Sequence, residues 1–344
     1  VTGYRSTRVS PSPGTPDRIR TPDWLAETEV ATSAVDSDAS DLTPATPSSI
    51  NGGGTGTATM PAAATSVVAA PLIRTVTLGA TSQESLAGIR LDPTTDPFLT
   101  QHLLDRRPIL PAVMGLEAMV EAAASGAQPG GLTVSEFKVH RPLRFASDEP
   151  AEIRVRVQQY GGVASCRLES ADGATLYQQA NVVFEPPDAS DVPELVTSHM
   201  PMFPFMWSED NRIWHGDAFR CLEEVIYQRD GGWGRIYAAD LAEVFGERKG
   251  DLIYTPAATL DSCLVTCGAD AFIMLGGRQE MPLEFNRMRM FRMPASDEKC
   301  MVRIFCRAQE PRHTVYDFTL YGEDGTPILD MAGYRGGLIN GTTT

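Results

Sequence analysis

The sequence predicts an α+β protein with two curved antiparallel sheets, each wrapped around a central helix. Three observations lead to this prediction. Residues 112–124 and 257–275 have helical patterns that are apolar on nearly every side, so each helix must be enclosed by the rest of the chain. The strand-like segments after each helix alternate apolar and polar residues, which gives each sheet one buried face. The same order of elements also occurs twice along the chain.

Residues 1–70 differ from the rest in composition. Stretches such as TPATPSSINGGGTGTATMPAAATS bury too little apolar surface to fold. We predict that this segment is a flexible low-complexity linker that tethers the folded part to a larger polypeptide. A tail on a free-standing protein is the alternative. The folded part is expected to comprise two units, residues 71–195 and 196–344.

The repeat is visible in four consecutive segments. The first copy reads PAVMGLEAMVEAAA, SEFKVHRPLRF, AEIRVRVQQY and SCRLESADGATLYQQANVVF, and the second reads PAATLDSCLVTCGADAFIML, LEFNRMRMFRM, CMVRIFCRAQ and YDFTLYGEDGTPILDMAGYR. Three pairs correspond at similar offsets: Pro111 and Pro256, Glu136-Phe137 and Glu284-Phe285, Asp172-Gly173 and Asp324-Gly325. Each copy therefore reads helix, strand, strand and hairpin, with an Asp-Gly turn in the hairpin. This architecture is a double hotdog.

Composition limits the partners and the location of the protein. The 344 residues carry a formal net charge of −15, which argues against nucleic acid, because a phosphate-binding surface needs clustered Lys and Arg. We see no apolar run of transmembrane length and no signal-peptide pattern, so we expect no membrane contact. The six cysteines stand apart in apolar contexts, which is typical of reduced, buried thiols in a cytoplasmic protein.

His102 lies nine residues before Pro111, where the first buried helix is expected to begin. Proline is favoured in a first helical turn, because its missing N–H is not needed there. The N–H groups of Ala112, Val113 and Met114 would then point toward the helix mouth, where they suit a carbonyl oxygen that gains negative charge. A lone histidine before a helix is more often a surface or capping residue.

Asp261 stands near the start of the second buried helix, among apolar neighbours. Burial raises the pKa of a carboxyl group, so we expect an acid that is protonated near neutral pH. A helix-start aspartate that interacts only with the helix dipole is the alternative. The repeat places His102 and Asp261 at equivalent ends of equivalent helices, which face each other in paired hotdogs. A base and an acid across one cleft suit a β-elimination of water from a hydroxyacyl thioester.

Three short motifs occur in order between residues 75 and 340. The first is His102, Arg106 and Pro111; the second is His215, Gly216, Asp217 and Phe219; the third is Leu260, Asp261 and Val265. This series resembles the dehydratase domains of polyketide and polyunsaturated fatty acid synthases. Those domains have glycine at the position of Arg106, Tyr-Gly-Pro-x-Phe as the second motif, and often Gln or His at the position of Val265. The stretch LPAVMGLEAM is most similar to iterative enediyne-type and polyunsaturated fatty acid synthase dehydratases.

The resemblance implies a domain of a multidomain synthase that converts 3-hydroxyacyl groups, carried by an acyl carrier protein, into trans-2-enoyl groups. His102 would be the base and Asp261 the acid. The substrate-binding residues would be Pro111, Ala112, Val113, Met114, His215, Gly216 and Phe219. No metal and no cofactor of its own is implied, since the phosphopantetheine belongs to the carrier protein. The other synthase domains are expected partners, and homodimers are common among such synthases.

Two departures from the family motifs keep other functions open. Arg106 replaces a flexible glycine near His102, and Val265 removes a hydrogen-bonding side chain that would orient Asp261. One alternative is a product-template-like cyclase, which also pairs His with Asp and would need a wide, deep pocket. The other is a catalytically silent hotdog module that docks carrier protein.

Overall fold

The computed structural model describes residues 65–66, 70–79, 81, 83–124, 130–196, 201–248, 250, 252–277 and 279–339. The predicted linker, residues 1–70, lies outside these ranges except for the short strand β1 (Thr65–Ser66) and Ala70. The flexibility of the linker therefore remains a prediction.

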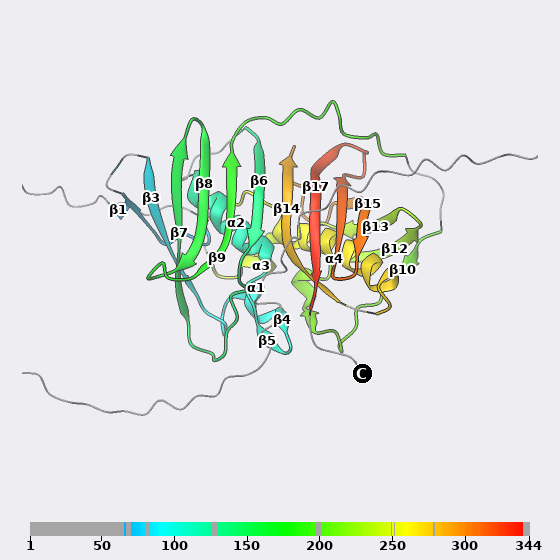
Figure 1. The fold of residues 1–344 in the computed structure, drawn as a ribbon, viewed down its shortest axis with the longest axis horizontal. Coiled ribbons are helices and arrows are strands. Elements are labelled where there is room, and N and C mark those ends of the chain that lie inside the picture. The colour runs from blue at the N-terminus through cyan, green and yellow to red at the C-terminus, as the bar shows by residue number, and fades with distance from the viewer. Residues whose placement is uncertain are drawn as a thin grey trace, which may run out of the picture.

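Fourteen strands form one antiparallel sheet that curves across the whole molecule (Figure 1). In spatial order they are β1, β2 (Thr75–Leu78), β3 (Glu84–Leu91), β7 (Ala151–Tyr160), β8 (Val163–Ser170), β9 (Leu176–Val183), β6 (Leu132–Val139), β14 (Glu280–Met290), β17 (Pro327–Leu338), β16 (His313–Tyr321), β15 (Lys299–Glu310), β13 (Gly231–Tyr237), β12 (Leu222–Gln228) and β10 (Phe203–Pro204). A separate small sheet has the order β11 (Ile213–His215), β4 (His102–Leu104) and β5 (Arg107–Pro108).

Two central helices lie against the sheet, one in each half of the molecule (Figure 1). Helix α2 (Ala112–Ala124) has only one residue that is not buried, and α4 (Ala257–Met274) is buried along most of its length. The short helices α1 (Pro97–Thr100) and α3 (Leu241–Phe245) pack near each other. The enclosed helices and the double-hotdog fold are therefore confirmed.

Helix α4 corrects one sequence expectation. Its 18 residues have a mean hydropathy of 1.3, so by length and composition alone it could cross a membrane. However, 67% of this helix is buried inside the protein, as expected for the core helix of a folded domain.

The two predicted sheets are joined edge to edge. Strand β6 pairs with β14 through equivalent residues of the two copies, with Phe137 opposite Phe285. The two rings stack with their centroids 4.7 Å apart. This pairing satisfies two strand edges that would otherwise be open, and it makes the halves share one hydrogen-bond network.

The predicted Asp-Gly hairpins are present in both copies. Gly173 has φ 79° between β8 and β9, and Gly325 has φ 82° between β16 and β17. Such left-handed backbone is accessible to glycine at little steric cost, which explains the residue at both turns.

Two buried glutamate side chains on α2 hold neighbouring segments in place. Glu117 accepts hydrogen bonds from the N–H groups of Tyr254 and Thr255 and from the Thr255 hydroxyl, at 2.8, 2.7 and 2.6 Å. Glu121 accepts from the N–H groups of Leu72 and Ile73 at 3.0 and 3.2 Å. Helix α2 thus binds, through Glu117, the segment directly before α4.

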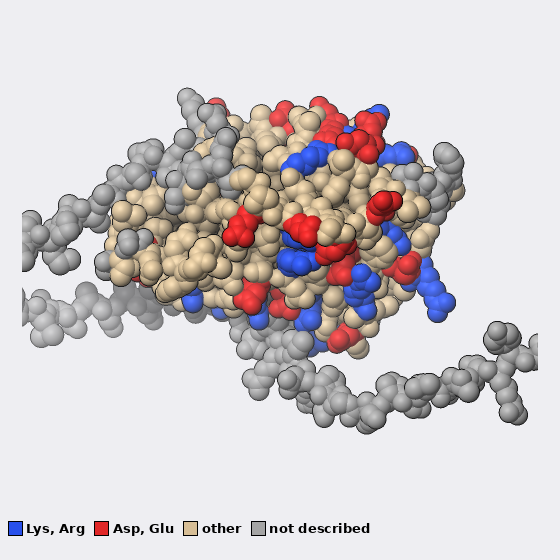
Figure 2. Space-filling view, turned by 90° about the horizontal axis from the view of Figure 1, so that it is seen from above, with Lys and Arg blue, Asp and Glu red and all other residues tan. Residues whose placement is uncertain are grey.

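Charged side chains are unevenly distributed on the face shown in Figure 2. Lys and Arg are intermingled with Asp and Glu over the second half, whereas the visible surface of the first half carries few charges. This face therefore presents no broad basic field of the kind that a nucleic acid phosphate backbone needs.

Candidate active site

His102 and His215 are brought together by the small sheet. Strand β4 pairs antiparallel with β11, and His102 lies directly opposite His215 in the register. The two rings are 4.8 Å apart between centroids and nearly perpendicular, at 87°. Because β4 precedes α2 and β11 precedes β12, this sheet carries one imidazole from each half of the chain to the same place.

The turn after His102 has a left-handed backbone, the conformation that favours glycine. Strands β4 and β5 are joined by Asp105 and Arg106, which have φ values of 50° and 64°. Both central residues of such a two-residue turn must be left-handed, a conformation that costs non-glycine residues about 1–2 kcal/mol. Arg106 therefore adopts a backbone conformation that glycine would adopt at lower cost. A bond of 2.7 Å from Arg212 to Asp105 secures the turn.

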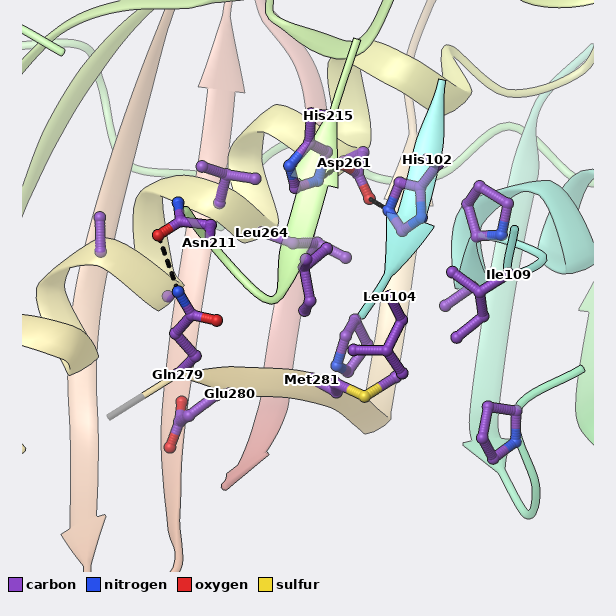
Figure 3. Close-up of a pocket in the computed structure, with 18 of the residues that line it drawn as sticks. His102, Leu104, Ile109, Asn211, His215, Asp261, Leu264, Gln279, Glu280 and Met281 are labelled. Atoms are coloured by element: carbon purple, nitrogen blue, oxygen red, sulfur yellow. Dashed lines mark hydrogen bonds and ion pairs between the residues drawn. The ribbon is translucent and has the colours of Figure 1, made fainter. Parts of the chain in front are cut away.

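Asp261 reaches the two imidazoles from the second turn of α4. His102 Nε2 lies 3.9 Å from Oδ1 of Asp261, and His215 Nε2 lies 3.1 Å from Oδ2. Figure 3 shows the three side chains grouped around the carboxylate at one end of a cavity. We call His102, His215 and Asp261 the site trio. The trio brings two imidazoles and one carboxyl group together in one place.

The trio is enclosed by aromatic side chains. His102, Asp261 and His215 are 8%, 6% and 9% exposed. The Phe219 ring packs against His102 with centroids 5.5 Å apart, and the Trp207 ring packs against His215 at 5.3 Å. Such burial strengthens the electrostatic coupling among the three groups.

Burial lowers the pKa of His102 to about 4, an effect that outweighs the opposing charge of Asp261. The imidazole is therefore neutral at neutral pH and has a free lone pair to accept a proton. Burial raises the pKa of Asp261, but the contact with His215 and the charges of His215 and His102 reverse this effect, and the pKa is lowered overall. We expected burial to raise the pKa of Asp261 and keep the carboxyl group protonated. The structure gives the opposite direction, because the two imidazoles lower this pKa.

The trio opens into a cavity of about 360 Å³. Most of its walls are apolar, with Leu104, Leu264 and Met281 between the trio and the far end, where Gln279 and Glu280 lie (Figure 3). A largely apolar cavity of this size with a few converging polar groups is typical of a small-molecule site.

The predicted substrate-binding residues fall into two groups. His215 lines the cavity as a member of the trio, and Pro111 and Ala112 line it beside the trio. The walls do not include Val113, Met114, Gly216 and Phe219. The Met114 N–H donates to the Pro111 carbonyl oxygen at 3.0 Å, so it is not free for a substrate oxygen. The Gly216 N–H donates to the Gln101 carbonyl oxygen at 2.7 Å. Gly216 therefore shapes the turn beside the site, and Phe219 supports the His102 ring.

Two polar residues of the cavity wall were not predicted from the sequence. Gln178 is buried in the cavity wall, and its Oε1 has no hydrogen-bond partner among the described residues. Glu280 Oε1 also has no hydrogen-bond partner among the described residues, its other oxygen accepts from the Thr314 hydroxyl, and burial raises the pKa of Glu280 to about 7. The sequence pattern could have predicted Gln178, because this residue lies on the same inward face of β9 as Ala180 and Val182. A polar residue on an otherwise apolar strand face is a candidate site residue.

Two family models match most of the described chain. A model described as polyketide synthase dehydratase domain matches residues 70–171. A second, described as polyketide synthase dehydratase N-terminal domain, matches residues 207–339. None of the curated proteins matches the chain significantly in sequence.

Several solved structures share the fold. The dehydratase domain of a mycocerosic acid synthase-like polyketide synthase has a TM-score of 0.63 at 20% identity, over 80% of this chain and 98% of that chain. The dehydratase domain of PpsC from Mycobacterium tuberculosis, in complex with C12:1-CoA, has a TM-score of 0.64 at 15% identity, over 79% and 99%. An inactive His-to-Phe variant of the CurJ dehydratase has a TM-score of 0.63 at 13% identity, over 79% and 98%. At these identities the similarity shows the fold.

Proposed function

The chain belongs to the family of polyketide synthase dehydratase domains, and we propose that it removes water from a 3-hydroxyacyl thioester to give the trans-2-enoyl thioester. The observation that supports this most directly is the convergence of His102 and Asp261, from different halves of the chain, on one cavity at 3.9 Å. An elimination needs a base and an acid within reach of adjacent carbons of one substrate.

In this proposal His102 is the base. Its Nε2 accepts the proton from the carbon next to the thioester carbonyl, and the electrons of that C–H bond form the new double bond. Burial holds the imidazole neutral before the reaction. Asp261 stabilises the imidazolium that forms, because its carboxylate lies 3.9 Å from the same nitrogen.

The departing hydroxyl receives its proton through Asp261. We infer that the proton is held between Asp261 and His215, whose Nε2 and carboxylate oxygen are 3.1 Å apart. After one turnover His102 carries the substrate proton and the Asp261–His215 pair has lost one. The trio thus keeps its total number of protons, and transfer from His102 through Asp261 to His215 restores the starting state. In this scheme His215 supplies the polar contact to Asp261 that Val265 does not provide.

The start of α2 is the proposed site for the thioester oxygen. Ala112 is the first residue of this helix and lines the cavity beside Pro111. N–H groups in a first helical turn have no partner within the helix and favour a developing negative charge. The Ala112 N–H would stabilise the enolate-like oxygen as the proton leaves.

We further propose that an acyl carrier protein delivers the substrate on its phosphopantetheine arm, and that the domain needs no cofactor of its own. The C12:1-CoA held by PpsC supports an acyl thioester as the class of ligand. The enediyne-type or polyunsaturated fatty acid subtype, the homodimer and the cytoplasmic location remain proposals from the sequence.

The direct test is conversion of a 3-hydroxyacyl pantetheine mimic by the full chain, followed as loss of water by mass spectrometry. The wild type should give the 2-enoyl product, and His102→Phe and Asp261→Asn should not. The His-to-Phe variant of CurJ that is inactive supports the choice of substitution. His313→Asn is the matched control, because His313 pairs with Glu310 at 3.3 Å and does not line the cavity.

Three results would contradict the proposal. Product formation by folded His102→Phe at the wild-type rate would show that His102 is not the base. A folded wild type that leaves several carrier-bound 3-hydroxyacyl chains unchanged would favour the silent docking module. Cyclisation of a polyketone without loss of water from the hydroxyacyl mimic would favour the cyclase.

A further inference from the structure

We propose that His102, His215 and Asp261 also form a binding site for a divalent transition-metal ion, zinc above all, and that bound zinc blocks the reaction. Metal binding stands on the geometry alone, whereas the inhibition rests on the proposed dehydratase function. Among the described residues, this trio is the group of His, Cys, Asp and Glu whose ligand atoms lie close enough to share one ion, all within 4.8 Å of one another.

The distances suit a zinc ion after small side-chain movements. Zinc binds imidazole nitrogen and carboxylate oxygen at about 2.0–2.2 Å, so two donors of a tetrahedral site are on the order of 3.4 Å apart. The Asp261 carboxylate lies 3.1 Å from His215 Nε2 and 3.9 Å from His102 Nε2. The donors therefore bracket the required separation, and the widest pair needs to close by on the order of 1.4 Å.

The donors come from three elements whose positions are fixed. His102 and His215 are cross-strand partners on β4 and β11, and Asp261 is held on the enclosed helix α4. All three also line the cavity, which leaves a fourth coordination position facing a substrate or water. Three protein ligands with one open position is the arrangement of an accessible rather than a purely structural zinc site.

The chemistry of the donors selects the class of metal. Two imidazoles and one carboxylate favour zinc, cobalt, nickel or copper, whereas magnesium and calcium prefer oxygen ligands throughout. The site lacks one feature of resident metal centres. His102 Nδ1 has no hydrogen-bond partner among the described residues, although a second partner normally fixes a metal-binding imidazole. We therefore infer an ion that binds reversibly and is not needed for the fold.

Zinc and catalysis compete for the same lone pair. A zinc ion on His102 Nε2 occupies the electrons that would accept the substrate proton. The ion would also coordinate the Asp261 carboxylate, which could then no longer pass a proton to the departing hydroxyl. Bound zinc should therefore abolish turnover, and a chelator should restore it.

Calorimetric titration of the chelator-treated full chain with zinc tests the site independently of activity. We expect one ion per chain, and more than about 100-fold weaker binding in His215→Phe, which exceeds the 10–100-fold loss typical of outer-shell changes. His215→Phe retains an aromatic ring against His102 and Trp207. His313→Asn and Cys306→Ser are controls that should bind zinc as the wild type does, since Cys306 is the one cysteine that is not fully buried.

Cobalt(II) gives a second readout. A site made of nitrogen and oxygen should show visible absorption without a sulfur-to-cobalt charge-transfer band. Wild-type affinity in His215→Phe, or a sulfur band, would overturn the proposed ligands, as would the absence of zinc binding. If zinc binds with the expected ligand pattern but the chelator-treated, zinc-free protein does not dehydrate any 3-hydroxyacyl substrate, the metal site stands and the proposed function fails. If the protein is an active dehydratase that zinc neither binds nor inhibits, the metal site fails alone.

Discussion

The two central helices begin at equivalent prolines but place their acidic residues one position apart. Five residues after Pro111 and Pro256 stand Leu116 in α2 and Asp261 in α4. Six residues after them stand Glu117 in α2 and Ser262 in α4. Successive helix residues differ in direction by about 100° because 3.6 residues make one turn. This shift by one position separates a carboxylate that faces the cavity from one that faces neighbouring backbone.

Because of this shift, the acidic residues of the two copies have different partners. Asp261 meets two imidazoles at the cavity, whereas Glu117 binds the backbone of residues 254–255, just before α4 begins. The Ser262 hydroxyl donates to the Phe219 carbonyl oxygen at 3.2 Å and does not face the cavity. The first helix therefore holds the second in position, and the second carries the proposed acid. A repeat can keep one fold while its copies divide chemistry and support between them.

Asp261→Asn should have the largest effect on activity. It removes the proposed proton donor, so we expect turnover to fall by about 10²–10⁴-fold, the usual contribution of an acid–base group. The thermal midpoint should stay within a few degrees of the wild type, because the amide is nearly isosteric. Steady-state kinetics and calorimetry check both parts. A large loss of stability would place Asp261 among the structural residues with Glu117.

Glu117→Ala should reverse this pattern. It leaves three buried donors of Tyr254 and Thr255 without an acceptor, at about 1–3 kcal/mol each. We expect the free energy of unfolding to fall by about 3–9 kcal/mol. Urea unfolding measures the loss.

Glu117→Gln is the milder companion variant and should lose less, because its amide oxygen retains an acceptor. Equal stability of the alanine variant and the wild type would show that Glu117 does not support the start of α4.

His215→Asn should lower kcat by about 10–100-fold and leave KM nearly unchanged, because it weakens proton supply and the orientation of Asp261 rather than substrate binding. A purely structural role would change stability and KM together. Val265→Gln provides a rescue test, since residue 265 lies one helical turn beyond Asp261 on the same face of α4. Partial recovery of kcat in the double variant is the expected result. A rise in KM with unchanged kcat would assign His215 to substrate binding.

Glu121→Gln should flatten the dependence of stability on pH. Burial, and then the charge of Glu117, raise the pKa of Glu121 from 4.5 to about 9. The folded protein therefore binds this proton more tightly than the unfolded chain, and stability falls as pH rises from about 5 through 9. We expect the wild type to lose on the order of 1–2 kcal/mol between pH 7 and 9.

The variant should lose less stability over the same range, measured by urea unfolding at each pH. Its amide oxygen can accept from Leu72 and Ile73 as Glu121 Oε2 does. Parallel curves for the two proteins would mean that Glu121 is ionised in the folded state.

Arg106→Gly should have the smallest effect and a stabilising one. The substitution relieves left-handed strain of about 1–2 kcal/mol but increases the freedom of the unfolded chain. The expected net gain is about 0.5–1 kcal/mol. Thermal unfolding measures it, with Arg106→Lys as a control that should match the wild type. Destabilisation by glycine would show that the arginine side chain makes a contact more important than the strain.

Local patterns predicted much of the fold. The uninterrupted apolar faces of α2 and α4 predicted enclosure, and the Asp-Gly pairs at 172–173 and 324–325 predicted the two hairpins. The joining of the sheets was not predicted, since the pairing of Phe137 with Phe285 depends on which strand edges meet in space. No local pattern encodes that choice.

The site was predicted in part for similar reasons. Motif spacing singled out His102 and Asp261, which do meet. The contact between His215 and Asp261 depends on the pairing of β4 with β11, more than one hundred residues apart in the chain. The lowered pKa of Asp261 was missed because burial alone raises it, and only the neighbouring imidazoles reverse the sign.

The pairing of β6 with β14 has a consequence for the integrity of the chain. Six cross-strand partners and a stacked pair of phenylalanines link the halves without using the peptide connection between them. A protease that cuts between β9 and β10 would therefore produce two fragments that stay associated as a complementing pair, with their histidines and their aspartate still facing one another. Gel electrophoresis would show two bands, while size-exclusion chromatography would show one peak.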